Sequence, residues 1–190
     1  MKKLIFVHTP KAAGCSIKKV LRPLGERWIN RDNINDNPPG PRYFYNRLDF
    51  VFGGRHPLAD RHIKANPDAL SFGVIMDPYV RMQLAYLQFT AGGNEPIEEF
   101  LPVLLEAMPN DEEYLGECDK ILRLSTLAED WKLFAIENDL PLELPHVNKS
   151  RPKWYKPELS LRLRNLIAER YAWTFKNFPF PRRCCAHQDP

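Results

Sequence analysis

Near its N-terminus the chain reads Leu4-Ile5-Phe6-Val7-His8-Thr9-Pro10-Lys11-Ala12-Ala13-Gly14-Cys15-Ser16-Ile17, and this stretch carries its clearest structural signal. The first four residues form a continuous apolar run, which is typical of a strand buried in a parallel sheet. Residues 16–24 then place four apolar side chains at helical spacing: Ile17, Val20, Leu21 and Leu24. The stretch therefore predicts a strand, a polar loop that contains a glycine, and a helix.

Downstream, short apolar runs alternate with helical patterns. Further strands are predicted at residues 50–52, 70–76 and 121–124, and helices at 62–65, 79–89, 96–108, 126–138 and 157–171. The alternation predicts one α/β domain over residues 1–190, disordered in about its last eight residues, with a mainly parallel central sheet flanked by helices. In such sheets, ligands lie beyond the carboxyl ends of the strands.

Composition excludes several classes of function. The 190 residues carry a net charge of +3, from 27 basic and 24 acidic residues, which is too mild to indicate nucleic-acid binding. No apolar stretch is long enough to span a membrane or to form the core of a signal peptide, so we expect a cytoplasmic protein. The cysteines match no zinc-binding spacing, so we expect free thiols and no metal: Cys15, Cys118, Cys184 and Cys185.

The first loop has the parts that an anion site needs. Gly14 lets the backbone approach a phosphate, and the helix start offers unpaired N–H groups and a positive dipole end. Lys11 adds a mobile charge and Ser16 a hydroxyl. The loop is not a Walker A motif, because Cys15 stands where the lysine belongs, which argues against a nucleotide kinase. The alternative is a turn that needs glycine and happens to carry a lysine.

The loop resembles the His-x-Pro-Lys-x-x-Gly-x-Ser loop of carbohydrate sulfotransferases, the Golgi-type enzymes and their bacterial relatives that use 3'-phosphoadenosine 5'-phosphosulfate (PAPS). Three later segments are similar to segments of that family in order and spacing: Phe52-Gly53-Gly54-Arg55-His56-Pro57, Ile75–Tyr86 with Asp77-Pro78 and Arg81, and Leu144-Pro145-His146-Val147-Asn148-Lys149-Ser150. The resemblance covers nearly the whole chain. It implies a P-loop-like, three-layer fold built around PAPS, which would donate sulfate to a carbohydrate or other small acceptor.

The resemblance also implies residue roles. Lys11 would stabilise negative charge on the bridging oxygen as the sulfuryl group leaves. The residues expected to line the cofactor site are Pro10, Lys11, Ala13, Gly14, Cys15, Ser16, Ile17, Arg81, Asn148, Lys149 and Ser150. His56 is the first candidate for the base that accepts the acceptor's proton, and His62 is the second. The alternative for either histidine is a purely structural role in a loop.

Two departures weaken the resemblance. The family binds the 3'-phosphate with an arginine before Asp-Pro and a serine eight residues later, but this chain has Met76 and Leu84. Without that arginine and serine, the 3'-phosphate lacks a charged and a hydroxyl partner, which are worth on the order of 2–4 kcal/mol of binding free energy. If both side chains simply extend the core, the 3'-phosphate pocket has closed. The alternative function is a divergent relative that has lost PAPS and binds another phosphate ligand or a partner.

Other polar residues are interpreted as structural. Asp77 is predicted to cap the helix at 79–89 rather than to act as an acid. His8 is predicted to position the loop backbone. The arginines of the last helix are expected to form its solvated face: Arg162, Arg164 and Arg170.

Overall fold

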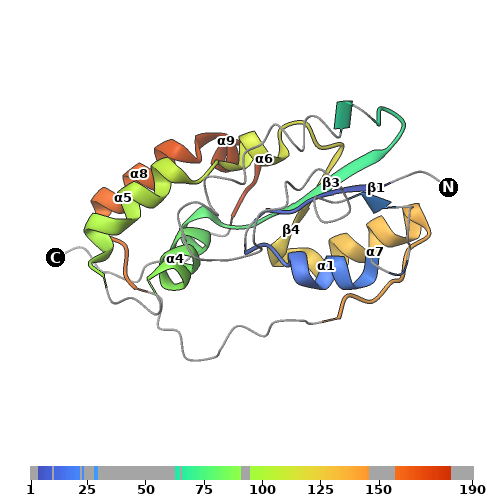
Figure 1. The fold of residues 1–190 in the computed structure, drawn as a ribbon, viewed down its shortest axis with the longest axis horizontal. Helices are drawn as coiled ribbons and strands as arrows, with labels where there is room; N and C mark the ends of the chain where they lie inside the picture. The colour runs from blue at the N-terminus through green and yellow to red at the C-terminus, as the bar shows by residue number, and fades with distance from the viewer. Residues whose placement is uncertain are drawn as a thin grey trace, which may run out of the picture.

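The computed structural model describes residues 4–9, 11–21, 23, 28–29, 63–64, 66–90, 95–145 and 157–180. Within these residues the sheet has four strands: β1 (Leu4–Val7), β2 (Trp28–Ile29), β3 (Leu70–Ile75) and β4 (Lys120–Arg123). Their order is β2-β1-β3-β4, and every neighbouring pair is parallel (Figure 1). The predicted α/β class with a parallel sheet is therefore confirmed.

β1 lies inside the sheet, between β2 and β3. Leu4 pairs with Leu70 and Val7 with Gly73, so the two strands are aligned over the whole length of β1. All four residues of β1 are buried. An unbroken apolar run suits this position, because a strand covered on both faces has no solvent side to which polar residues could be assigned.

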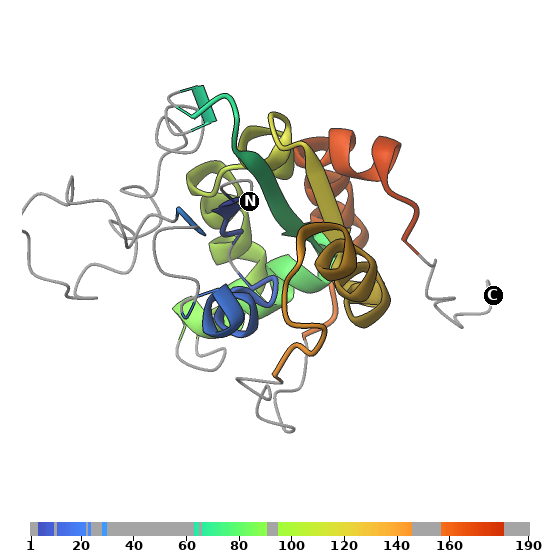
Figure 2. The same cartoon turned by 90° about the vertical axis from the view of Figure 1, so that its right-hand side faces the viewer.

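Helices cover both faces of the sheet (Figures 1 and 2). α1 (Gly14–Leu21) and α7 (Leu127–Asn138) pack on one face, where Leu4 and Phe6 of β1 enter the same core. α6 (Asp111–Leu115) and α9 (Ala172–Asn177) supply side chains to the other face, which contains Ile5 and Val7. Alternate residues of β1 thus enter cores on opposite sides, as the pleat of a strand requires.

Three more helices form a core of their own. α4 (Pro78–Phe89), α5 (Ile97–Ala107) and α8 (Leu161–Arg170) contact one another and bury a shared apolar cluster. Figure 1 shows this group on the side of the sheet where β3 leads into α4. A short 3-10 turn, η3 (Leu124–Thr126), joins β4 to α7.

Several boundaries differ from the predictions. α1 begins two residues early, at Gly14, and ends at Leu21, just before Pro23 removes a backbone donor. The predicted helix at 157–171 begins only at Leu161, because the Ser160 hydroxyl caps it by accepting from Leu163 N–H at 3.2 Å. The chain then continues into α9, which was not predicted. The patterns also missed α6 and β2, which are too short to show a period.

Two predicted elements fall mainly outside the described residues. The strand predicted at 50–52 lies entirely outside them. Of the helix predicted at 62–65, residues 63–64 are described, and these are helical.

Candidate functional site

The strand order marks one edge of the sheet as the place for a ligand. β1 pairs with β2 on one side and with β3 on the other. The chain therefore adds its second strand on one side of β1 and its third strand on the opposite side. In open parallel sheets, such a reversal creates a crevice beyond the carboxyl ends of the two strands involved. At this edge the loop of residues 8–13 follows β1, and Met76 and Asp77 follow β3.

The loop after β1 has an unusual backbone. Among the described non-glycine residues only three have a positive φ, and two are in this loop: Lys11 at 70° and Ala13 at 54°. The left-handed conformation costs an L-residue roughly 1–2 kcal/mol, so contacts must hold it in place. Thr9 makes two of them, donating from Oγ1 to the Val74 carbonyl and accepting from Ala12 N–H at 3.4 Å. Left-handed residues in a turn are a feature of the backbone concavities whose N–H groups bind anions.

α1 begins where this loop ends. The Ala13 carbonyl accepts hydrogen bonds from Ser16 N–H at 3.0 Å and from Ile17 N–H at 3.2 Å, which closes the first turn. The first N–H groups of a helix have no acceptor within it, and the positive end of the helix dipole lies at the same place. The loop and the helix start therefore offer backbone donors that suit a phosphate or sulfate group.

Gly14 lies against the imidazole ring of His8. A Cβ at this position would lie 1.9 Å from His8 Nε2 and 2.1 Å from His8 Cδ2, far inside any permitted contact. The sequence predicts that Gly14 lets a phosphate approach the backbone closely. In the structure the exposed imidazole ring of His8 lies on this side of the Gly14 Cα, and the approach of a phosphate to Gly14 stays a prediction.

Lys11 supplies the positive charge of the loop. Its side chain is half-buried, and burial lowers the pKa of its ammonium group from the ordinary 10.5, while the charge of nearby Cys15 acts to raise it. Cys15 itself is an exposed free thiol. An ammonium that has lost part of its water interacts more strongly with an anion, because the effective dielectric constant around it is lower. Lys11 therefore fits the predicted role of a phosphosulfate partner.

The other predicted cofactor residues are either buried beside the helix start or lie outside the described residues. The Ile17 side chain is fully buried in the core and its N–H already donates to Ala13, so the structure offers neither to a cofactor. Ser16 is 8% exposed, at the border of that core. The remaining predicted site residues lie outside the described part of the chain: Pro10, His56, His62, Asn148, Lys149 and Ser150.

The segment after β3 provides little for a second phosphate. Met76 is 4% exposed and Leu84 is half-buried, so apolar side chains occupy both positions where the family carries its 3'-phosphate ligands. Asp77 caps α4, accepting at Oδ1 from Tyr79 N–H at 2.8 Å and from Val80 N–H at 3.4 Å. The predicted capping role of Asp77 is confirmed, and its charge at the start of α4 opposes anion binding there.

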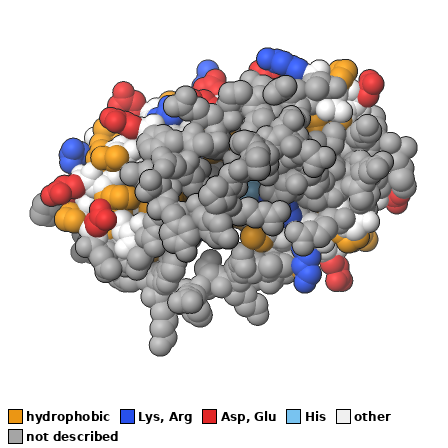
Figure 3. Space-filling model, in the orientation of Figure 1, with side chains coloured by type: hydrophobic (Ala, Val, Ile, Leu, Met, Phe, Trp, Pro, Cys, Tyr) orange, Lys and Arg blue, Asp and Glu red, His pale blue; other side chains and the backbone are white. Residues whose placement is uncertain are grey.

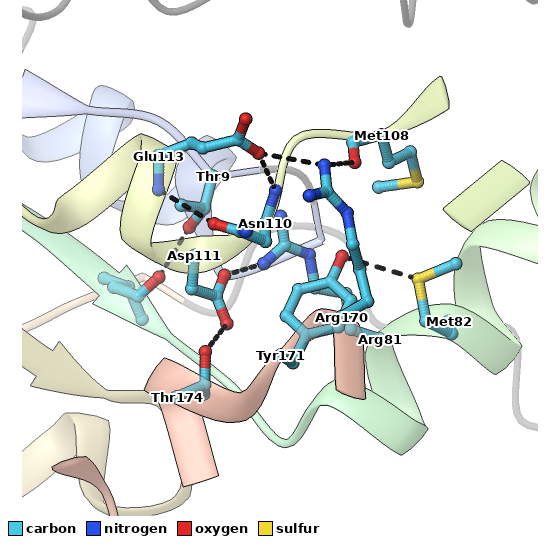
Figure 4. A network of polar contacts seen from close by, with 11 residues as sticks. Thr9, Arg81, Met82, Met108, Asn110, Asp111, Glu113, Arg170, Tyr171 and Thr174 are labelled. Carbon is cyan, nitrogen blue, oxygen red and sulfur yellow. Dashed lines mark hydrogen bonds and ion pairs between the residues drawn. The ribbon is translucent and has the colours of Figure 1, made fainter. Parts of the chain in front are cut away.

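Arg81, a predicted cofactor residue, has different partners in the structure (Figure 4). It is 1% exposed, and its Nη1 donates to Asp111 Oδ1 in a buried ion pair. Asp111 Oδ2 in turn accepts from Thr174 Oγ1 at 2.9 Å. The rings of Tyr114 and Tyr171 each have their centroid 5.6 Å from the guanidinium carbon. Arg81 therefore joins α4 to α6 and α9.

The Arg81 guanidinium is not fully satisfied. Its Nε and Nη2 are buried without a hydrogen-bond partner. Because the side chain is almost wholly buried, it does not lie open to a nucleotide in this structure, and we leave it out of the ligand site. The sequence contained no signal for Asp111 or Thr174, which lie 30 and 93 positions further along the chain and belong to no motif.

The arginines of α8 do more than form a solvated face. Only Arg162 behaves as predicted, with a 65% exposed side chain and a loose ion pair to Glu98 at 3.5 Å. Arg164 lies over the Tyr79 ring, 5.6 Å from its centroid. Arg170 donates to the carbonyls of α5 and of the segment after it, at Leu105 and Met108. These arginines therefore also fasten α8 to α4 and α5.

Charge and metal-binding groups give no competing site in the described residues. On the face drawn in Figure 3, the coloured Lys and Arg side chains are interspersed with Asp and Glu rather than gathered in one patch. The described part of the chain brings together no group of three or more His, Cys, Asp or Glu side chains suited to a metal ion. None of its helices combines the length and apolar character needed to cross a bilayer.

Comparison with known proteins adds no assignment. The chain matches no family model, no curated protein and no solved structure.

Proposed function

We propose that this chain is a PAPS-dependent sulfotransferase with a P-loop-like fold, acting on a hydroxyl group of a carbohydrate or another small acceptor. One observation carries the proposal. At the carboxyl end of β1, where the strand order reverses, a half-buried Lys11 sits in a loop with two left-handed residues that leads into the start of α1. A loop of this kind suits an anionic sulfate donor, and its sequence resembles the 5'-phosphosulfate loop of the family.

The residues of the loop fit the needs of sulfuryl transfer. Bound PAPS would supply the activated sulfuryl group. Backbone N–H groups of residues 13–15 would hold the 5'-phosphate, and the Lys11 ammonium would neutralise the negative charge that develops on the bridging oxygen. The acceptor oxygen forms the new bond to sulfur as the bond to the bridging oxygen breaks. The acceptor's proton passes to a base, for which His56 and His62 remain the candidates.

The residues after β3 favour weak binding of the 3'-phosphate. Met76 is buried, Leu84 is apolar, and Arg81 is engaged with Asp111. A second candidate function therefore rests on these residues: a divergent relative that has lost PAPS and binds another phosphate ligand. The two functions differ in whether the 3'-phosphate contributes to affinity.

Isothermal titration calorimetry with 3'-phosphoadenosine 5'-phosphate separates the candidates, with adenosine 5'-phosphate as the ligand that lacks the 3'-phosphate. We expect the first nucleotide to bind, and Lys11→Met to weaken it by about 10- to 100-fold, the value of one charged hydrogen bond. Lys19→Met, which replaces an exposed lysine on α1, the helix that follows the loop, is the matched control. No binding of the 3'-phosphorylated nucleotide to the folded protein would exclude the sulfotransferase.

Restoring the family ligands tests the second candidate. If the 3'-phosphate has lost its pocket, both nucleotides bind the natural chain equally, and Met76→Arg with Leu84→Ser tightens only the 3'-phosphorylated one. If that nucleotide already binds at least tenfold more tightly before restoration, the divergent function is wrong. Turnover of ATP with magnesium would instead support a nucleotide kinase.

A further inference from the structure

We infer that His8 is a positioning residue for the anion loop, and that its ring and Gly14 act as a matched pair. The inference rests on the proposed function, because it concerns how the same loop is held for its ligand. It begins from the space beside Gly14: the three atoms nearest to a Cβ at that position all belong to the His8 ring, the farthest of them at 2.7 Å.

The His8 side chain is exposed, and its ring has two neighbours. One side stacks on Phe6, with centroids 5.8 Å apart and planes at 23°. Phe6 is 3% exposed and packs in turn against Phe72 of β3, with centroids 5.2 Å apart. The other contact is with Gly14, the first residue of α1. The ring thus bridges the end of β1 and the start of α1, and the loop of residues 9–13 spans the two points it connects.

Backbone conformation does not explain the glycine. Gly14 does not have a positive φ, so a residue with a side chain would adopt the same backbone without strain. The left-handed positions of the loop are taken by Lys11 and Ala13 instead. The place of the His8 ring in the structure, and not the backbone, is therefore the feature that favours glycine at position 14.

The pair has a direct consequence for ligand binding. The N–H groups at the start of α1 keep their place relative to Lys11 only if the distance between β1 and α1 is kept. A methyl group at position 14 would drive the ring out or push the helix start away, and loss of the ring would leave the helix start without its support. Each change should weaken anion binding, and the two should not be additive.

A double-mutant cycle tests the inference with three proteins: Gly14→Ala, His8→Ala and the variant that carries both substitutions. His8→Phe and Asn165→Ala, which changes an exposed residue of α8, are the controls. Affinity is measured by calorimetry with inorganic pyrophosphate and with 3'-phosphoadenosine 5'-phosphate, and folding by urea unfolding. We expect Gly14→Ala and His8→Ala each to lower affinity by about tenfold. In a protein that already carries His8→Ala, Gly14→Ala should change affinity by less than about twofold. The interaction energy that this difference implies is within the range measured for residues in contact. His8→Phe should stay within about threefold of the natural chain because it keeps a ring of similar size.

Several results would overturn the inference. Additive effects of the two alanine substitutions would show that the ring and the glycine act separately, and a loss in His8→Phe equal to that in His8→Ala would assign the role to the imidazole nitrogens. If Gly14→Ala does not fold, recovery of folding by adding His8→Ala supports the pair, and failure to recover contradicts it. Binding of pyrophosphate without the nucleotide overturns the sulfotransferase alone, whereas binding of neither probe removes the anion site and this inference with it.

Discussion

Lys11 is the residue on which the chemistry of the loop depends most. Its left-handed backbone is unfavourable by itself, and its half-buried ammonium has lost water that it would keep in the unfolded chain. A bound anion offsets the second cost, because it favours the charged form of the lysine. In the proposed site, the loop would thus be organised before a ligand arrives, and ligand binding would offset part of the cost of burying the ammonium.

This coupling predicts how affinity changes with pH. The Lys11 pKa lies below 10.5 in the free protein, so affinity is full while the ammonium is charged and falls as the pH rises through that lowered pKa. The guanidinium of Lys11→Arg stays charged over the whole range measured, so this variant should lose the decline. The measurement is calorimetry with sulfate, whose charge is constant between roughly pH 7 and 10, in a Cys15→Ser background that removes the second titratable group. Parallel declines in the lysine and arginine proteins would contradict the assignment.

At the scale of elements, the junction between β3 and α4 is specified locally. Asp77 accepts hydrogen bonds from the first N–H groups of α4, and Pro78 occupies the first helical position, where its missing N–H is harmless. The helix therefore begins at one defined residue beside the proposed ligand edge. The residue before α1 is Ala13, whose side chain has no oxygen with which to accept from the first N–H groups of that helix.

Removing this cap should destabilise the fold with little change at the anion loop. Asp77→Ala is expected to lower the free energy of unfolding by about 1 kcal/mol, while Asp77→Asn should lose only part of that, because asparagine also caps helices. Urea unfolding gives the measurement, and the exposed Asp68→Ala is the control, for which we expect less than about 0.5 kcal/mol. An Asp77→Ala protein as stable as the natural chain would show that the cap hydrogen bonds contribute nothing.

At the scale of the whole molecule, a buried ion pair links the helices around the sheet. Arg81 on α4, Asp111 on α6 and Thr174 on α9 meet in one network (Figure 4). The Arg81 guanidinium also lies near the rings of Tyr114 and Tyr171. The three helices come from distant parts of the sequence. The pair therefore ties the helical group of α4, α5 and α8 to the layer that covers the sheet.

Breaking the pair from one side should be costly. Arg81→Met or Asp111→Ala leaves an uncompensated buried charge, so we expect each to lower the free energy of unfolding by about 3–5 kcal/mol. Arg81→Met combined with Asp111→Leu removes both charges and should lose much less. The exposed pair of Arg162 and Glu98 is the control, where Arg162→Met should cost less than about 1 kcal/mol in the same urea experiment. Equal losses in the single and double variants at Arg81 and Asp111 would contradict a paired role.

The elements of the described core could be predicted because their signals are local. An unbroken apolar run marked β1, helical spacing marked α4, α5 and α7, and Asp77-Pro78 marked the start of α4. The proposed phosphate loop also has a local signature, since its lysine, glycine and serine lie within six residues. In each case hydrophobic burial and backbone hydrogen bonding involve residues that are close in sequence, so they appear as local patterns in the sequence.

Packing determines the rest. No local pattern could pair Arg81 with Asp111 rather than with a cofactor, because the two meet only when α4 and α6 pack together. The reason for Gly14 was likewise hidden, since glycine suits both a ligand and a neighbouring ring, and only the folded chain brings His8 against it. Side chains that are far apart in sequence come into contact only when the sheet and the helices pack together, and this packing determines which of them become partners.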